Sequence, residues 1–140
     1  MLGGGSVGAA ADDAVYFVIG VRNVGAGIAV LDRWDFYAER GPGLPEMRTI
    51  DSFQRLSRDI YVPAGDIGFW QGAFRDTGDP RFEAASAAIR ERRPMTIDIL
   101  YGDQEGGQRA VARFGLIPVG EDAWLSAVSR HWNIDRENPR

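Results

Sequence analysis

The sequence predicts a mainly β fold: an antiparallel β-sandwich of about seven strands with one short helix around residues 80–93. Apolar side chains recur at every second position along most of the chain. Short turns rich in glycine, proline and aspartate separate these runs, and a single segment has clear helical spacing. Since helices do not alternate with strands, the pattern favours an antiparallel fold over a parallel α/β sheet.

The first half of the chain contains three strong strand patterns. Residues 14–22 are rich in β-branched and aromatic side chains, with Val15, Phe17, Ile19 and Val21 on one face. Within residues 28–38 the apolar side chains move from odd positions, Ala29 and Leu31, to even positions, Trp34 and Phe36. A β-bulge near Leu31 and Asp32 would bring all four to the same face of the strand. Residues 39–48 form a loop and residues 63–66 a turn. Residues 67–74 then form another strand.

The second half begins with the helix. Asp79 is a suitable N-cap, Pro80 suits the first helical position and Pro94 prevents continuation. Residues 95–101 and 110–116 alternate on either side of a glycine turn, which predicts a hairpin with Thr96 and Asp98 outward. Residues 124–134 fit either a strand or a helix, and the strand is favoured.

The composition sets the domain organisation and excludes several classes of protein. Residues 1–13 predict a flexible lead-in or linker, 14–135 a single domain and 136–140 a tail. No segment has the ~18–20 apolar residues of a membrane span. The net charge of −4 argues against nucleic acid as a partner, and the absence of cysteine excludes disulfides and thiolate metal sites.

The stretch RNVGAGIAV (22–30) begins like a dinucleotide-binding loop. Val30 replaces the third glycine, and a strand pattern follows where that fold needs a helix. The favoured alternative is a hairpin turn in which Asn23, Gly25 and Gly27 adopt positive φ. The sequence therefore predicts neither a cofactor nor a metal.

The segment RDIYVPAGDIGFWQGAFRD (58–76) is the most distinctive in the chain. Trp70, Gln71 and Arg75 in it, with Trp132 near the C-terminus, are candidate binding residues, since tryptophan beside arginine can stack on sugar rings or a partner surface. The favoured interpretation is nevertheless that the four tryptophans fill the core between the strands.

A further set of candidates carries ionisable groups. Asp103 and Arg109 flank the glycine turn, and His131 is the single histidine of the chain. A hydrolase would need two of Asp66, Asp103, Glu105 and His131 to meet in one pocket. No G-x-S-x-G nucleophile motif is present.

Four blocks of sequence resemble one family: RNVGAGIAVL (22–31), YVPAGDIGFWQGAFRD (61–76), YGDQEGGQRAVARFGL (101–116) and SRHWNID (129–135). The family is that of uncharacterised bacterial immunoglobulin-like β-sandwich domains of unknown function. The resemblance implies an immunoglobulin-like architecture and a soluble domain tethered to a membrane through upstream helices. It supplies no catalytic residues.

Three functions remain open from the sequence. The favoured one is a non-catalytic interaction or recognition domain of a larger bacterial protein, whose partner is another protein or another domain of that parent. The second is a module that binds carbohydrate or a small ligand through exposed tryptophan and arginine. The third is the hydrolase built on Asp, Glu and His.

Overall fold

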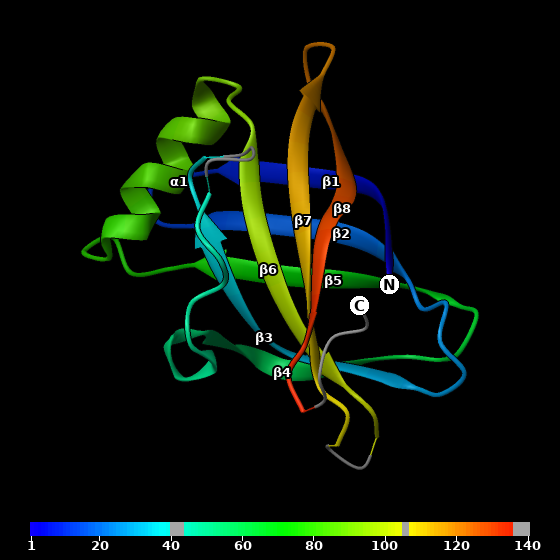
Figure 1. Ribbon diagram of the computed structural model, residues 1–140. Coiled ribbons are helices and arrows are strands. Elements are labelled where there is room, and N and C mark those ends of the chain that lie inside the picture. Colours follow the sequence, from blue (N-terminus) through cyan, green and yellow to red (C-terminus); the bar gives the residue numbers. More distant parts are fainter. Residues whose placement is uncertain (40–43, 105–106, 136–140) are drawn as a thin grey trace.

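The computed structural model describes residues 1–39, 44–104 and 107–135. These residues form one eight-stranded antiparallel sheet, in the order β4-β3-β6-β7-β8-β1-β2-β5, and one α-helix. The elements are β1 Leu2–Ala10, β2 Val15–Arg22, β3 Ala29–Tyr37, the 3₁₀ turn Ile50–Ser52, β4 Gln54–Val62, β5 Ile67–Phe74, α1 Pro80–Arg90, β6 Met95–Gly102, β7 Ala110–Val119 and β8 Ala123–Asn133. In Figure 1, β6, β7 and β8 cross β1, β2 and β5, and α1 lies at one side of the sheet.

The mainly β, antiparallel character and the helix are confirmed, but the strands form one curled sheet and not two separate ones. Strand β1 is the reason, because it pairs with β2 along most of its length and with β8 at Gly5 and Ser6. Without β1, the order would break into a five-stranded group and the β2-β5 pair. The short β1–β8 pairing therefore joins what the sequence predicts as two sheets.

The glycine-rich start of the chain forms this strand, contrary to the prediction of a flexible lead-in. Glycine is needed at Gly3, where a Cβ would lie only 3.0 Å from the Ser126 carbonyl oxygen. The backbone of Gly4 exchanges two hydrogen bonds with the Ser126 hydroxyl, at 3.2 and 2.8 Å. A Cβ at Gly8 would lie 3.4 Å from the Ile89 side chain, so α1 packs directly on β1. The glycines here permit close packing.

An aromatic cluster fills the concave side of the sheet. Trp34 and Trp70 pack edge to face with ring centroids 5.3 Å apart, and Phe17 and Phe74 pack against Trp34 and against each other. The four tryptophans of the chain are all buried, Trp34, Trp70, Trp124 and Trp132. The favoured prediction, that the tryptophans fill the core, is therefore the one that the packing supports.

Helix α1 begins where its sequence indicates and ends earlier than expected. Asp79 accepts a hydrogen bond from the Arg81 amide at 2.9 Å, and Pro80 occupies the first turn. The helix ends at Arg90, short of the predicted Arg93, because Arg92 adopts a positive φ of 56°. Side-chain hydrogen bonding from Arg81 lowers the pKa of Asp79, which keeps the cap ionised.

The segment around GAG is neither a nucleotide loop nor a hairpin. A strand, β3, follows it, and β2 pairs with β1 and β5 while β3 pairs with β4 and β6. Neither Gly25 nor Gly27 has a positive φ. The buried Asn23 instead holds the connection, because its amide donates to the carbonyls of Gly27 and Val62 at 2.7 and 3.0 Å.

Residues 44–53 cover the convex face over β6 and β7. Thr96 and Asp98 point toward this outer face, as predicted, but the covering segment buries both side chains. Asp98 accepts two hydrogen bonds from Arg113, at 2.7 and 2.9 Å. Arg113 also donates to the Pro45 carbonyl at 2.8 Å, and Arg48 forms an ion pair with Asp35 at 2.8 Å. These bonds fasten the covering segment to the sheet.

Candidate functional site

The two ends of the sheet meet at one place. Strands β4 and β5 are its terminal strands, yet they are consecutive in the chain and joined by the turn at residues 63–66. Near this turn they pack tightly, since a Cβ at Gly68 would lie 2.6 Å from Val62. No strand pairing joins β4 to β5 over the described ranges, so the sheet stays open between them.

Part of β4 also lacks a partner on its other side. Ile60 pairs with Leu31 of β3, and the next pair along β3 joins Arg33 to Arg55. The four residues between, Leu56–Asp59, bulge out and have no register partner on β3. Backbone N–H and C=O groups in an unpaired extended segment are available for another strand.

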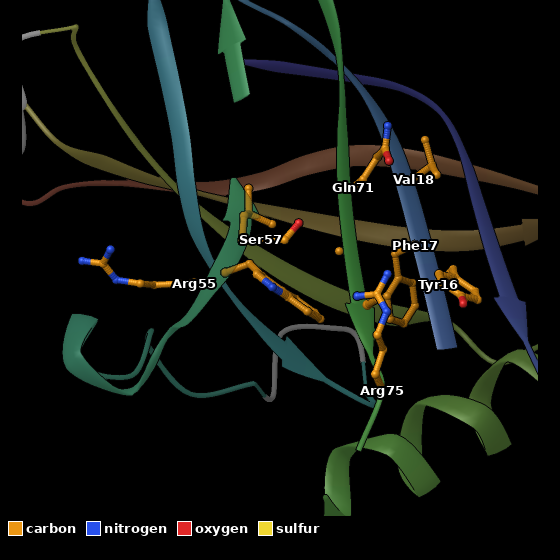
Figure 2. Close-up of a pocket in the computed structure, with 11 residues that line it drawn as sticks. Tyr16, Phe17, Val18, Arg55, Ser57, Gln71 and Arg75 are labelled. Carbon is orange, nitrogen blue, oxygen red and sulfur yellow. The ribbon is translucent and has the colours of Figure 1, made fainter. Parts of the chain in front are cut away.

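Two adjoining cavities lie between β4 and β5 along this bulge. One has a volume of about 290 Å³ and the other about 260 Å³, and they share Leu56, Ser57 and Gln71 in their walls. We call them together the β4–β5 groove. Figure 2 shows the larger cavity, with Ser57 pointing from β4 toward β5. The buried Trp34 lies in its wall.

Large apolar side chains are exposed around this groove. Phe69 is 62% exposed and lines the smaller cavity, and farther along β4 Tyr61, which lines neither cavity, is 60% exposed. Tyr16 of β2, also exposed, lines the larger cavity. Exposed aromatic side chains gathered beside open strand edges are typical of a surface that binds another protein.

The groove is locally cationic in a chain with a net charge of −4. Its walls include Arg55, Arg58 and Arg75 against one acid, Asp59. None of these arginines forms an ion pair with a described residue, and Arg75 lies 5.6 Å from the Tyr16 ring centroid. In Figure 2 the Arg75 guanidinium lies beside Tyr16 and Phe17, whereas Arg55 points away from the other labelled side chains.

The structure brings two of the sequence candidates to this groove and buries two others. Gln71 and Arg75 are exposed in its walls. Trp70, between them and the core, is 0% exposed, and its indole faces inward. Trp132, 7% exposed, belongs to a separate cluster with Phe53 on the convex face. Neither indole presents a surface on which a sugar could stack.

Arg109 and His131 meet at a different place, the end of β7 and β8. They line a small cavity of about 230 Å³ together with Tyr101, whose hydroxyl is hydrogen-bonded to Nε2 of His131. Arg109 forms an ion pair with Asp135 at 2.9 Å, and its hydrogen bonds lower the pKa of that carboxyl. Asp103 lies in the neighbouring loop and accepts a hydrogen bond from the Gly107 amide at 2.8 Å.

His131 is expected to titrate below the usual imidazole pKa of about 6.5, because partial burial, and secondarily the positive N-terminus, lower its pKa. The unfolded chain then binds the proton at a higher pH than the folded chain. The free energy of unfolding should therefore fall as the pH drops through about 6.5. His131 is the single histidine, so its Cε1–H resonance follows this titration without assignment. A midpoint equal to that of the urea-unfolded chain would contradict the expectation.

The hydrolase residues do not assemble. Asp66 lies at the β4–β5 turn, where its carbonyl accepts a hydrogen bond from the Asn23 amide. Asp103 lies in the β6–β7 connection. None of the cavities described above is lined by two of Asp66, Asp103 and His131. Glu105 falls outside the described residues. Over the ranges that the structure describes, no three His, Asp or Glu side chains are placed to hold a metal ion.

Sequence reasoning missed the β4 side of the groove, namely Arg55, Ser57 and Arg58. One signal was present: polar residues interrupt the alternation across RLSRD (55–59). A strand with arginine and aspartate at both parities cannot bury one face cleanly, and this pattern is typical of an irregular edge.

Comparison with known proteins leaves the site unassigned. No family model and no curated protein sequence matches the chain. Among solved structures, a crystal structure of a protein from Archaeoglobus fulgidus is similar over 96% of this chain and 95% of that chain, with 13% identity and a TM-score of 0.31. A likeness at this level supports no argument about fold family or function. In the described ranges, no helix is long and apolar enough to cross a membrane.

Proposed function

We propose that this chain is a non-catalytic recognition domain that binds a protein partner at the β4–β5 groove. The observation that carries the proposal is the open edge: Leu56–Asp59 pair with neither neighbouring strand and face the free edge of β5. Exposed Phe69 and Tyr16, which line the groove, supply apolar contact area beside it. Fold alone suggests no function, whereas an unpaired edge with exposed aromatics is a specific binding feature.

The other two functions have less support. A carbohydrate module built on tryptophan needs an exposed indole, and all four are buried. A hydrolase needs two ionisable groups in one cavity, and the described candidates are dispersed. The open edge favours a polypeptide ligand, because main-chain hydrogen bonds to a free strand are best satisfied by another backbone.

Site-specific photocrosslinking in the native host tests the proposal. A photoreactive phenylalanine analogue is placed at Ser57, on the β4 side of the groove, and separately at Gln71 on the β5 side. The expected result is that both positions crosslink to the same segment of one partner protein. Glu83, exposed on α1, is the matched control position and should not give that adduct. The proposal would be refuted if neither groove position gave an adduct, or if Glu83 gave the same adduct in equal yield.

The finer classification is also a proposal. The resemblance of residues 22–31 and 61–76 to immunoglobulin-like domains supports placing the chain among them, within a larger, membrane-tethered bacterial protein. Reading the genomic frame around this sequence tests the tether, which requires apolar spans of about 20 residues upstream.

A further inference from the structure

We propose that the partner segment in the β4–β5 groove is an acidic strand, which adds to the free edge of β4 at Leu56–Asp59 and places a carboxylate against Arg75. This inference rests on the proposed function and names the chemistry of its ligand. It requires the edge to accept a backbone and the groove to favour negative charge, and separate features of the structure support the two requirements.

The backbone requirement is met by the bulge. Strand edges in native sheets are usually protected by short length, by pairing or by a covering loop. Here four consecutive residues, Leu56–Asp59, leave the β3 ladder and lie along cavities of about 290 and 260 Å³. Opposite them, Gln71–Ala73 pair with β2 on one side only. An extended segment in this space can form hydrogen bonds that the domain does not form internally.

The charge requirement is met by the arginines. Arg55, Arg58, Arg75 and Asp59 line the groove, and within the described ranges these arginines make no ion pair. In Figure 2, Arg55 points away from the other labelled side chains, and it interacts electrostatically with Asp32, which leaves Arg58 and Arg75 as the cations available to a ligand. A guanidinium binds a carboxylate through two parallel hydrogen bonds, which adds direction as well as charge. Arg75 lies on the rim of the larger cavity beside Tyr16, so a carboxylate there gains the arginine while its chain packs on the ring.

The test uses the ¹⁵N-labelled full chain and three short blocked peptides. In the first, glutamate alternates with valine; in the second, lysine replaces each glutamate; in the third, a central proline interrupts the acidic peptide. The acidic peptide is expected to shift the amides of Leu56–Asp59 and Gln71–Ala73 and to slow their hydrogen exchange. Its affinity should exceed that of the lysine peptide by about tenfold and fall with added salt.

Two variants locate the charge contact. Arg75→Gln is expected to weaken binding of the acidic peptide about tenfold, since one charge-assisted pair is lost. Arg90→Gln removes an exposed arginine from the end of α1 and should leave the affinity unchanged. Thermal unfolding of both variants checks that the fold is retained.

Other results would overturn the inference in distinguishable ways. Equal binding of the lysine peptide would refute the acidic preference, and equal binding of the proline peptide would refute strand pairing. No shift with any peptide at millimolar concentration would refute both. If photocrosslinking at Ser57 and Gln71 still captured one partner segment, the proposed function would stand and this ligand chemistry would be wrong.

Discussion

Replacing Asp98 with alanine is expected to lower the free energy of unfolding by about 3–5 kcal/mol. The Arg113 side chain is 6% exposed and donates to both oxygens of Asp98, so its charge would remain buried without a counter-charge. Arg113 also donates a hydrogen bond to the Pro45 carbonyl, so a displaced Arg113 would weaken the attachment of residues 44–53 to the sheet. Chemical denaturation monitored by tryptophan fluorescence measures the loss.

Two comparisons show whether the buried pair is responsible. Burial raises the pKa of Asp98 in spite of Arg113, so desolvation of the pair is not fully offset. The double variant Asp98→Leu, Arg113→Met should therefore recover much of the stability lost by Asp98→Ala. Glu46→Ala breaks the exposed pair with Arg130 and should change stability by less than about 1 kcal/mol. If Asp98→Ala lowered the free energy of unfolding no more than Glu46→Ala does, the buried Asp98–Arg113 pair would not stabilise the covering segment as described.

Replacing Trp70 with alanine is expected to cost about 3–5 kcal/mol of folding stability. Trp70 is fully buried against Trp34, and its ring lies so close to Gly72 that a Cβ there would be 2.5 Å from the indole. Because the β5 backbone at Gly72 packs directly against the indole, it is not expected to move in and fill the cavity that Trp70→Ala leaves. Equilibrium unfolding in guanidinium chloride measures the effect.

Matched variants separate packing from ligand binding at this position. Among the described residues, the buried Trp70 Nε1 has no hydrogen-bond partner, so Trp70→Phe removes an unsatisfied donor along with volume and should cost less than Trp70→Ala. The adjacent, exposed Gln71→Ala should stay within about 0.5 kcal/mol of the parent. A stability change at Gln71 as large as that at Trp70 would contradict the assignment of these side chains to opposite faces.

Most elements of the fold were predictable because they depend on local pattern, with strands β1 and β4 as the exceptions. Alternation, the Asp79–Pro80 start and the parity change at Leu31–Asp32 indicated the remaining strands, the helix and the bulge. In β1, glycine was interpreted as flexibility. At Gly3 its real reason is the close approach of Ser126, a residue far along the chain. Missing β1 also led to the prediction of two sheets, since β1 is the strand that joins them.

The candidate site was harder to predict, because it depends on which strands become neighbours. Gln71 and Arg75 were singled out for their position in a distinctive segment, yet nothing local placed Ser57 opposite them. The same limit hid the Asp98–Arg113 pair: cross-strand register brings them together, and alternation alone predicted Asp98 to be solvated. Periodicity reveals which side of a strand is apolar, and only the assembled sheet shows what covers the other side.

The central claim is that Leu56–Asp59 form a free strand edge, and amide hydrogen exchange of the unliganded chain tests it most directly. The predicted result is rapid exchange at Leu56–Asp59, in contrast to slow exchange at Ala112–Leu116, which pair on both sides in the middle of the sheet. Protection at Leu56–Asp59 equal to that at Ala112–Leu116 would contradict the claim, because it would mean that the edge already has a partner and the groove is closed.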